Sequence, residues 1–146
     1  MFNKVLVPID GSPSALRAVG CAKQYLAEGI AKQVTLIHVA SIVTEIIGLD
    51  GFTTSTFNTE VMDWVEKAAA EVVARSRVVF EEAGLPVRTV VTFGNPAESI
   101  CAFAEQENCD LIIMGCRGLS KLQELLLGSV SDRVLKLAKC PVLIVK

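Results

Sequence analysis

The sequence predicts an α/β fold: a single doubly wound, five-stranded parallel sheet with four helices, in one domain spanning residues 1–146. Apolar segments of strand length alternate with helical patterns from end to end, which is the arrangement that produces parallel sheets. A chain of 146 residues has the size of one domain. Hydrophobic residues make up 51% of it and charged residues 21%, an ordinary mixture for a globular protein with a sizeable core.

Five short apolar segments predict the strands, in this order: residues 4–9, 33–40, 87–93, 110–114 and 142–145. The first segment ends at the turn signal Asp10-Gly11. The fourth is apolar enough to be buried on both faces, which is typical of a strand inside a parallel sheet. An irregular stretch, residues 41–58, follows the second strand, and a loop of this length inside a compact domain is often functional.

Four helices are predicted between the strands: residues 13–29, 60–83, 96–108 and 129–138. Ser12-Pro13 and Asn95-Pro96 are both typical of an N-cap followed by a first helical residue. The second helix is long, and Trp64 belongs to its apolar stripe, so we expect this side chain in the core.

Two strand orders are common for five such strands, 3-2-1-4-5 and 2-1-3-4-5, and the alternation of elements fits both. Ligands of such sheets bind beyond the carboxyl ends of the strands where the order reverses. In the first order this point lies between strands 1 and 4, beside residues 8–11 and 114–118. In the second order it lies between strands 1 and 3.

A glycine-rich loop follows the fourth strand with the pattern G-x2-G-x9-G-S, formed by Gly115, Gly118, Gly128 and Ser129. Glycines let the backbone approach a ligand closely and adopt positive φ. The free N–H groups at the start of the last helix favour a phosphate. Arg117 and the hydroxyl groups of Ser129 and Ser131 add further hydrogen-bond donors.

The simpler interpretation of this loop is a turn at Gly115 and Gly118 and an N-cap at Ser129. The preceding strand, the second glycine at the helix start and the position at the sheet edge together favour the phosphate site instead. Neither of the better-known phosphate loops, G-x4-G-K-[ST] or G-x-G-x-x-G, is present.

Several segments in the same order resemble the universal stress protein family, of the nucleotide-binding kind. They are KVLVPIDGSPSA, IHV, DLIIMG, the glycine-rich loop and KCPVLIVK, and they cover the whole chain. The resemblance implies the strand order 3-2-1-4-5. It also implies an adenine nucleotide as ligand, ATP or AMP or ADP, with or without Mg²⁺.

The resemblance further implies a set of binding residues. Asp10 would lie beside the ribose and phosphates, and beside Mg²⁺ where the metal is present. The Val39 backbone would contact the adenine. The complete set of expected binding residues is Pro8, Asp10, Val39, Met114, Gly115, Arg117, Gly118, Gly128, Ser129, Val130 and Ser131. Cys116 is less usual at its position in the family and introduces a thiol.

Three functions fit these residues. The first is a stress-response regulatory module that binds an adenine nucleotide, the second is a slow ATPase, and the third is a structural dimerisation domain without a ligand. Efficient hydrolysis needs a metal site, a base and a charge stabiliser. Asp10 and Arg117 could serve as the first and the last, but no base is evident, because His38 lies in an apolar strand and is expected to be a core residue. No catalytic residue is therefore predicted, and the binding module is favoured.

The composition also limits partners and compartment. The net charge is −2 without a block of Lys or Arg, which argues against nucleic acid as a partner. No apolar run approaches a membrane span. Five cysteines without a C-x-x-C motif indicate a reducing, cytoplasmic compartment rather than a disulfide scaffold. Of these, Cys21, Cys101, Cys109 and Cys140 are expected to pack as small hydrophobes.

Residues 142–145 predict a homodimer. In the order 3-2-1-4-5 they form an edge strand that is apolar on both faces, and exposed apolar edges are normally blunted or covered. A two-fold partner strand is the simplest cover, and the family resemblance implies the same interface. The alternative is that residues 41–58 cover this edge.

Overall fold

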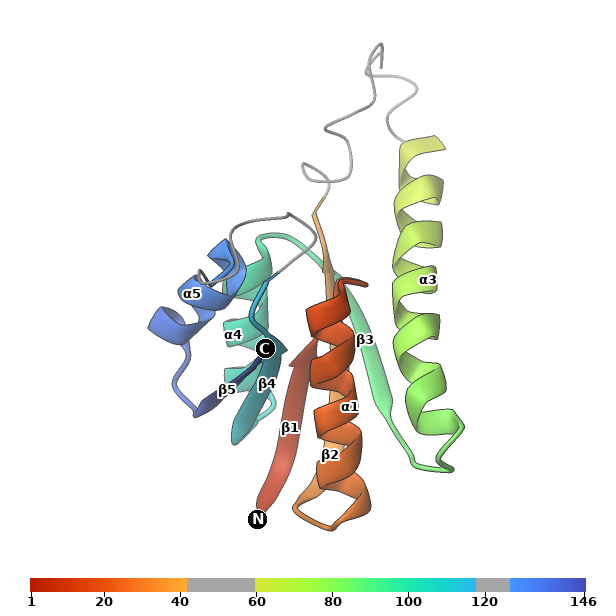
Figure 1. Ribbon diagram of the computed structural model, residues 1–146. Coiled ribbons are helices and arrows are strands. Elements are labelled where there is room, and N and C mark those ends of the chain that lie inside the picture. Colours follow the sequence, from red (N-terminus) through yellow and green to blue (C-terminus); the bar gives the residue numbers. More distant parts are fainter. Residues whose placement is uncertain (42–59, 118–126) are drawn as a thin grey trace.

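Five parallel strands form one sheet in the order β3-β2-β1-β4-β5 in the computed structural model, which describes residues 1–41, 60–117 and 127–146 (Figure 1). The strands are β1 (Phe2–Pro8), β2 (Ala31–Ala40), β3 (Arg88–Phe93), β4 (Leu111–Gly115) and β5 (Val142–Val145). All four neighbouring pairs are parallel. The predicted fold class is confirmed, and the order 3-2-1-4-5 is found rather than 2-1-3-4-5.

Helices cover both faces of the sheet (Figure 1). They are α1 (Pro13–Ala27), α3 (Met62–Glu81), α4 (Pro96–Gln106) and α5 (Ser129–Leu137). On one face, Val19 of α1 and Phe80 of α3 pack with Val7 of the central strand β1. On the other face, Ile100 of α4 and Val134 of α5 share a second core. Because β1 contributes to both cores, its side chains are apolar on both sides, as expected for a buried parallel strand.

The predicted helix starts are confirmed at two positions. Ser12 is the N-cap of α1, and its Oγ accepts a hydrogen bond of 3.2 Å from Ala15 N–H. Asn95 is the N-cap of α4, and its Oδ1 accepts a hydrogen bond of 3.2 Å from Glu98 N–H. None of the helices within the described ranges is both long and apolar enough to cross a membrane.

The expected core position of Trp64 is wrong, because this side chain is 48% exposed. The buried stripe of α3 instead runs through residues spaced four apart, of which Val61, Val65 and Ala69 are the first. Apolar residues lie on two adjacent stripes of this helix, so its periodicity alone does not distinguish them. The stripe that includes small residues such as Ala69 packs on the sheet, and Trp64 remains on the flank.

The start of β1 is held to β4 by Asp110. Its carboxylate accepts hydrogen bonds from Asn3 N–H at 2.8 Å and from Lys4 N–H at 2.9 Å. Partial burial raises the pKa of this carboxyl group, but the N–H groups of Asn3 and Lys4 stabilise the charged form, and the pKa lies below its ordinary value.

We therefore expect Asp110→Asn to lower the free energy of unfolding by about 1 kcal/mol at pH 7. A carboxyl group with a lowered pKa stabilises the fold above its ordinary pKa, and this contribution is lost as the pH falls through the folded-state value. The difference between parent and variant should thus shrink below roughly pH 4. Urea unfolding of both proteins across the pH range measures it. A constant difference would show that the carboxylate charge contributes nothing.

Candidate functional site

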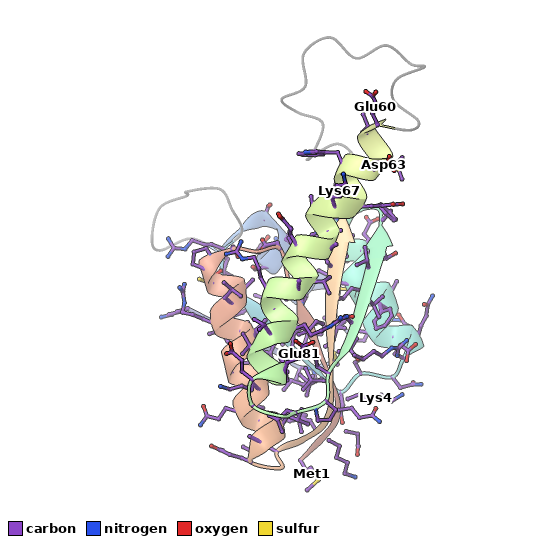
Figure 2. The ribbon with its side chains drawn as sticks, turned by 90° about the vertical axis from the view of Figure 1, so that its right-hand side faces the viewer. Met1, Lys4, Glu60, Asp63, Lys67 and Glu81 are labelled. Carbon is purple, nitrogen blue, oxygen red and sulfur yellow. The ribbon has the colours of Figure 1, made fainter. Side chains whose placement is uncertain are left out.

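The carboxyl ends of β1 and β4 lie side by side at one edge of the sheet, where the strand order reverses. Figure 1 shows the N-terminal ends of α1 and α5 at this same edge. Figure 2 places Glu60 and Asp63 toward this end of the molecule, and Met1 and Lys4 at the opposite end. Two helix N-termini thus converge on the crevice where open α/β sheets bind ligands.

Two buried serines hold the segment after β4 against α1. The Ser14 Oγ donates to Arg117 O and accepts from Arg117 N–H at 3.3 Å. The Ser12 Oγ also lies within 3.4 Å of Arg117 O. Both serines are almost fully buried. The sequence does not indicate a role for Ser14, because nothing in its local pattern points to a contact with a residue so far along the chain.

Gly115 lies where β4 and the start of α1 approach each other closely. A Cβ atom at this position would lie 2.6 Å from the backbone carbon of Ser14 and 2.8 Å from Ala15 N. On its other side, Gly115 O accepts a hydrogen bond of 2.9 Å from Ser131 Oγ at the start of α5. Gly115 therefore lets both helix N-termini approach the same strand end.

Positive φ, which was expected in the glycine-rich loop, is not found at Gly115 or Gly128. Between the ends of β1 and β4, a positive angle is found at Gly11, with φ of 81°. The turn after β1 needs it because α1 begins immediately afterwards. Close approach, rather than backbone conformation, explains the glycine at position 115.

The N-terminus of α5 begins at Gly128, which cannot supply a capping side chain. Its φ of −62° and ψ of 158° are those of an ordinary N-cap. Gly128 N–H donates to Cys116 O at 2.7 Å, which anchors the helix start to the chain after β4. Ser129 is exposed, whereas Ser131 is buried and donates to Gly115 O. The first N–H groups of α5 thus carry the positive end of the helix dipole without an internal cap.

The backbone of Val39 faces the crevice beyond the end of β1. Ile9 N–H donates to Ile37 O at 2.9 Å, and Gly94 N–H donates to Ala40 O at 3.2 Å. Because successive residues of a strand direct their backbone groups to opposite neighbours, Ile37 and Val39 face β1 whereas Ala40 faces β3. Within the described ranges no group accepts a hydrogen bond from Val39 N–H. One strand edge is therefore open to a ligand at this position.

The His38 side chain is bonded to the end of β1 beside Val39. Its Nδ1 lies 2.9 Å from Ile9 O, the acceptor that Val39 N–H would use if β1 continued. A carbonyl only accepts, so Nδ1 carries the hydrogen of this bond. The side chain is 6% exposed, and Nε2 has no partner among the described residues. The expected core position is confirmed, with one of the two ring nitrogens hydrogen-bonded.

Asp10 closes the turn between β1 and α1. Its Oδ1 accepts a hydrogen bond of 2.9 Å from Ser12 N–H. In the described part of the chain no cluster of three or more His, Cys, Asp or Glu side chains could hold a metal ion. One carboxylate together with ligand phosphates and water is nevertheless a common way to bind Mg²⁺, and the chemistry of Asp10 fits that role.

The expected binding residues therefore converge on one edge of the sheet. Pro8, Asp10, Gly115 and Arg117 surround the ends of β1 and β4, while Gly128, Ser129, Val130 and Ser131 begin α5. The side chain of Met114 lies in the core, so only its backbone remains for a ligand. Gly118 lies outside the described residues.

Comparisons with known proteins place the chain in one family. The chain matches the model of the Universal stress protein family over residues 1–146. It is 34% identical over 149 residues to the universal stress protein YxiE of Bacillus subtilis, and 100% of each chain is covered. The universal stress protein MJ0577 of Methanocaldococcus jannaschii is 33% identical, and the match covers 100% of this chain and 96% of that protein.

Solved structures give the same result. The structure of MJ0577 superposes with a TM-score of 0.83 at 34% identity, covering 100% of this chain and 96% of that one. A universal stress protein solved in complex with cAMP superposes with a TM-score of 0.63 at 26% identity, covering 99% and 97% of the two chains.

Proposed function

This chain belongs to the universal stress protein family, and we propose that it is a regulatory module that binds an adenine nucleotide at the carboxyl edge of its sheet. The observation that carries the proposal is the open backbone of Val39 beside two converging helix N-termini. A strand edge can recognise a base by paired hydrogen bonds, and helix N-termini favour phosphate. The solved relative in complex with cAMP supports an adenine nucleotide as the ligand.

Each group would contribute one kind of contact. The first N–H groups of α5 and the exposed Ser129 hydroxyl would hold phosphate oxygens. The N–H and C=O of Val39 would pair with one edge of the base. The Ser131 hydroxyl is already bound to Gly115 O and would position the helix start rather than the ligand. Mg²⁺, when bound, would neutralise phosphate charge beside Asp10.

Calorimetric titration tests this proposal. ATP with Mg²⁺ should bind with a Kd on the order of micromolar, equivalent to about −8 kcal/mol, and GTP should bind at least about tenfold more weakly, because a backbone edge distinguishes the base edges that adenine and guanine present. ADP, AMP and cAMP in parallel titrations identify the preferred phosphate chain. The absence of both heat and a thermal shift with every adenine nucleotide would refute the proposal.

A binding module is favoured over an ATPase because no base for water is evident at this edge among the residues that the structure describes. His38 is buried and its Nδ1–H is bound to Ile9 O. Incubation of ATP with a stoichiometric amount of protein for hours separates the two functions. Little or no ADP should form, and multiple turnovers within minutes would instead identify an enzyme.

We also propose a homodimer through β5. Its four residues are half-buried in the single chain. Ile112 N–H donates to Pro141 O and Cys116 N–H donates to Val145 O, both at 3.0 Å, so the odd-numbered residues of this strand face β4. The backbone groups of Val142 and Ile144 consequently face outward, available to the same strand of a second copy.

Proline substitutions in β5 test the dimer. Leu143→Pro removes an N–H that faces β4, and it should lower the free energy of unfolding by about 3 kcal/mol. Ile144→Pro removes only an outward N–H and should yield a folded monomer. The parent should be dimeric at tens of micromolar. Sedimentation equilibrium at this concentration shows whether each proline variant is a dimer or a monomer. A monomeric parent protein would refute the dimer, as would an Ile144→Pro variant that remains fully dimeric.

A further inference from the structure

A hollow lined by three cysteines lies at the amino edge of the sheet, opposite the candidate nucleotide site. Its volume is about 160 Å³. Cys101 lies on α4, Cys109 on the turn between α4 and β4, and Cys140 on the connection between α5 and β5. All of them are free thiols, half-buried against the second core. These residues are far apart in the sequence, and the fold brings them together.

The strand register brings the segments that carry Cys109 and Cys140 side by side. Ile112 lies opposite Val142, and Ile112 N–H donates to Pro141 O at 3.0 Å. Cys109 lies two residues before the start of β4, and Cys140 lies two residues before the start of β5. Both side chains pack against the second core and line the same hollow.

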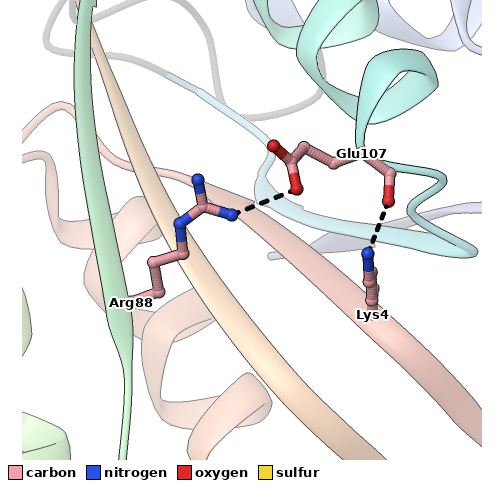
Figure 3. Close-up of polar contacts among 3 residues, drawn as sticks. All are labelled: Lys4, Arg88 and Glu107. Carbon is pink, nitrogen blue, oxygen red and sulfur yellow. Dashed lines mark hydrogen bonds and ion pairs between the residues drawn. The ribbon is translucent and has the colours of Figure 1, made fainter.

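The turn that carries Cys109 is held firmly. Cys109 N–H donates to Ala104 O at 2.8 Å. Figure 3 shows Glu107, two residues before it, contacting Arg88 of β3 and Lys4 of β1. Its carboxylate pairs with Arg88 at 3.1 Å, and its carbonyl oxygen accepts from Lys4 Nζ at 3.0 Å.

The connection that carries Cys140 is anchored on both sides. Ala138 N–H donates to Val134 O at 2.8 Å, and Pro141 O accepts from Ile112 N–H at 3.0 Å. Lys139 also pairs with Glu105 of α4 at 2.8 Å, but both side chains are largely exposed, and such pairs contribute little. Backbone hydrogen bonds therefore hold both cysteine-bearing segments beside the hollow.

The environment of both thiols favours their protonated form. Burial, followed by the nearby Cys140 and then Glu107, raises the pKa of Cys109 to about 11, although Lys4 acts in the opposite direction. Burial also raises the pKa of Cys140. Because the protein does not stabilise the thiolate form, the reduced pair is not favoured over the disulfide. Little thiolate is present at neutral pH, so the disulfide should form slowly and, once formed, resist reduction.

We propose that Cys109 and Cys140 are a modification site that forms an intramolecular disulfide by exchange with a low-molecular-weight disulfide such as oxidised glutathione. One protein thiolate attacks the glutathione disulfide, which forms a mixed disulfide and releases one glutathione thiolate. The second protein thiolate then attacks the protein sulfur of the mixed disulfide and releases the second glutathione. The protein loses two electrons and two protons, and one oxidised glutathione becomes two reduced molecules.

The test is incubation of the folded protein with oxidised glutathione, followed by thiol counting under denaturing conditions. The parent has five thiols, and it should lose two of them without gaining glutathione mass. Because only the thiolate reacts, the rate should rise about tenfold per pH unit between roughly pH 7 and 9. Cleavage after Glu107, before Asp110 and after Lys139 separates Cys109 from both Cys101 and Cys116 and releases the peptide that begins with Cys140. Mass spectrometry without reduction should find the Cys109 and Cys140 peptides joined.

Serine variants provide the matched controls. Cys109→Ser and Cys140→Ser should form no intramolecular disulfide, whereas Cys101→Ser, from the same hollow, should behave as the parent does. The parent disulfide should raise Tm by roughly 5 °C. A linkage that uses Cys101, a parent that forms only mixed disulfides, or a parent that loses no thiols would each overturn the proposal.

Discussion

Gly115→Ala should lower the free energy of unfolding by about 3 kcal/mol, which corresponds to roughly 10 °C in Tm. The added Cβ would lie 2.6 Å from the backbone carbon of Ser14 and 2.8 Å from Ala15 N. Backbone atoms at a helix start cannot move aside as the end of a side chain can, so α1 must shift away from β4. Thermal and urea unfolding measure the loss.

Gly20→Ala is the matched control. Gly20 lies inside α1, and nothing lies within 4 Å of the position its Cβ would take. Alanine should therefore raise the stability by about 0.5 to 1 kcal/mol, through helix propensity alone. The double variant Ser14→Ala with Gly115→Ala should remain destabilised, because the backbone contacts persist. A Gly115→Ala protein as stable as the parent would show that the two elements have room to adjust.

The largest expected effect on binding comes from Ser129→Asp. This residue is exposed at the first position of α5, so the substitution fits without repacking. A carboxylate there interacts favourably with the helix dipole and should raise stability by about 0.3 to 0.5 kcal/mol. The same charge repels phosphate, and at short range it should weaken ATP binding by about 2 kcal/mol, roughly thirtyfold in Kd.

Ser129→Asn separates charge from shape. Asparagine has nearly the same size as aspartate but no charge, so it should weaken ATP binding only a few-fold. Calorimetry with ATP and with adenosine, combined with thermal unfolding, completes the test, because adenosine lacks the phosphates and should bind both variants alike. Equal ATP affinity in the aspartate variant and the parent would remove the start of α5 from the site.

Local chemistry allowed much of this fold to be predicted from the sequence. The caps at Ser12 and Asn95 act within a few residues, and so does the alternation of apolar segments and helices. The strand order could not be predicted from local chemistry, because the alternation fits two orders and the family resemblance is needed to choose between them. The same resemblance, rather than periodicity, indicated the Val39 backbone. The structure adds the physical reason, which is that β1 ends at Pro8 while β2 continues to Ala40.

What could not be predicted depends on contacts between distant segments. Trp64 and Val65 are equally apolar, and only the sheet surface decides which of them is buried. The sequence places Gly115 in the phosphate loop, but it gives no sign of the close contact with α1 that an added Cβ at this position would make. The cysteines pack against the core as small hydrophobes, as expected, but that three of them line one hollow could not be predicted, because they come from distant segments.

The bond between Ser14 and Arg117 has a consequence for the order of assembly. It joins residues 103 positions apart in the chain. During synthesis the first three strands emerge before β4, and they can pair as one contiguous half of the sheet in the order β3-β2-β1. That half contains Asp10 and Val39 but neither Gly115 nor α5. The crevice is therefore complete only after the last fifth of the chain has been made, so a ligand held there would stabilise finished molecules and leave partial chains unaffected.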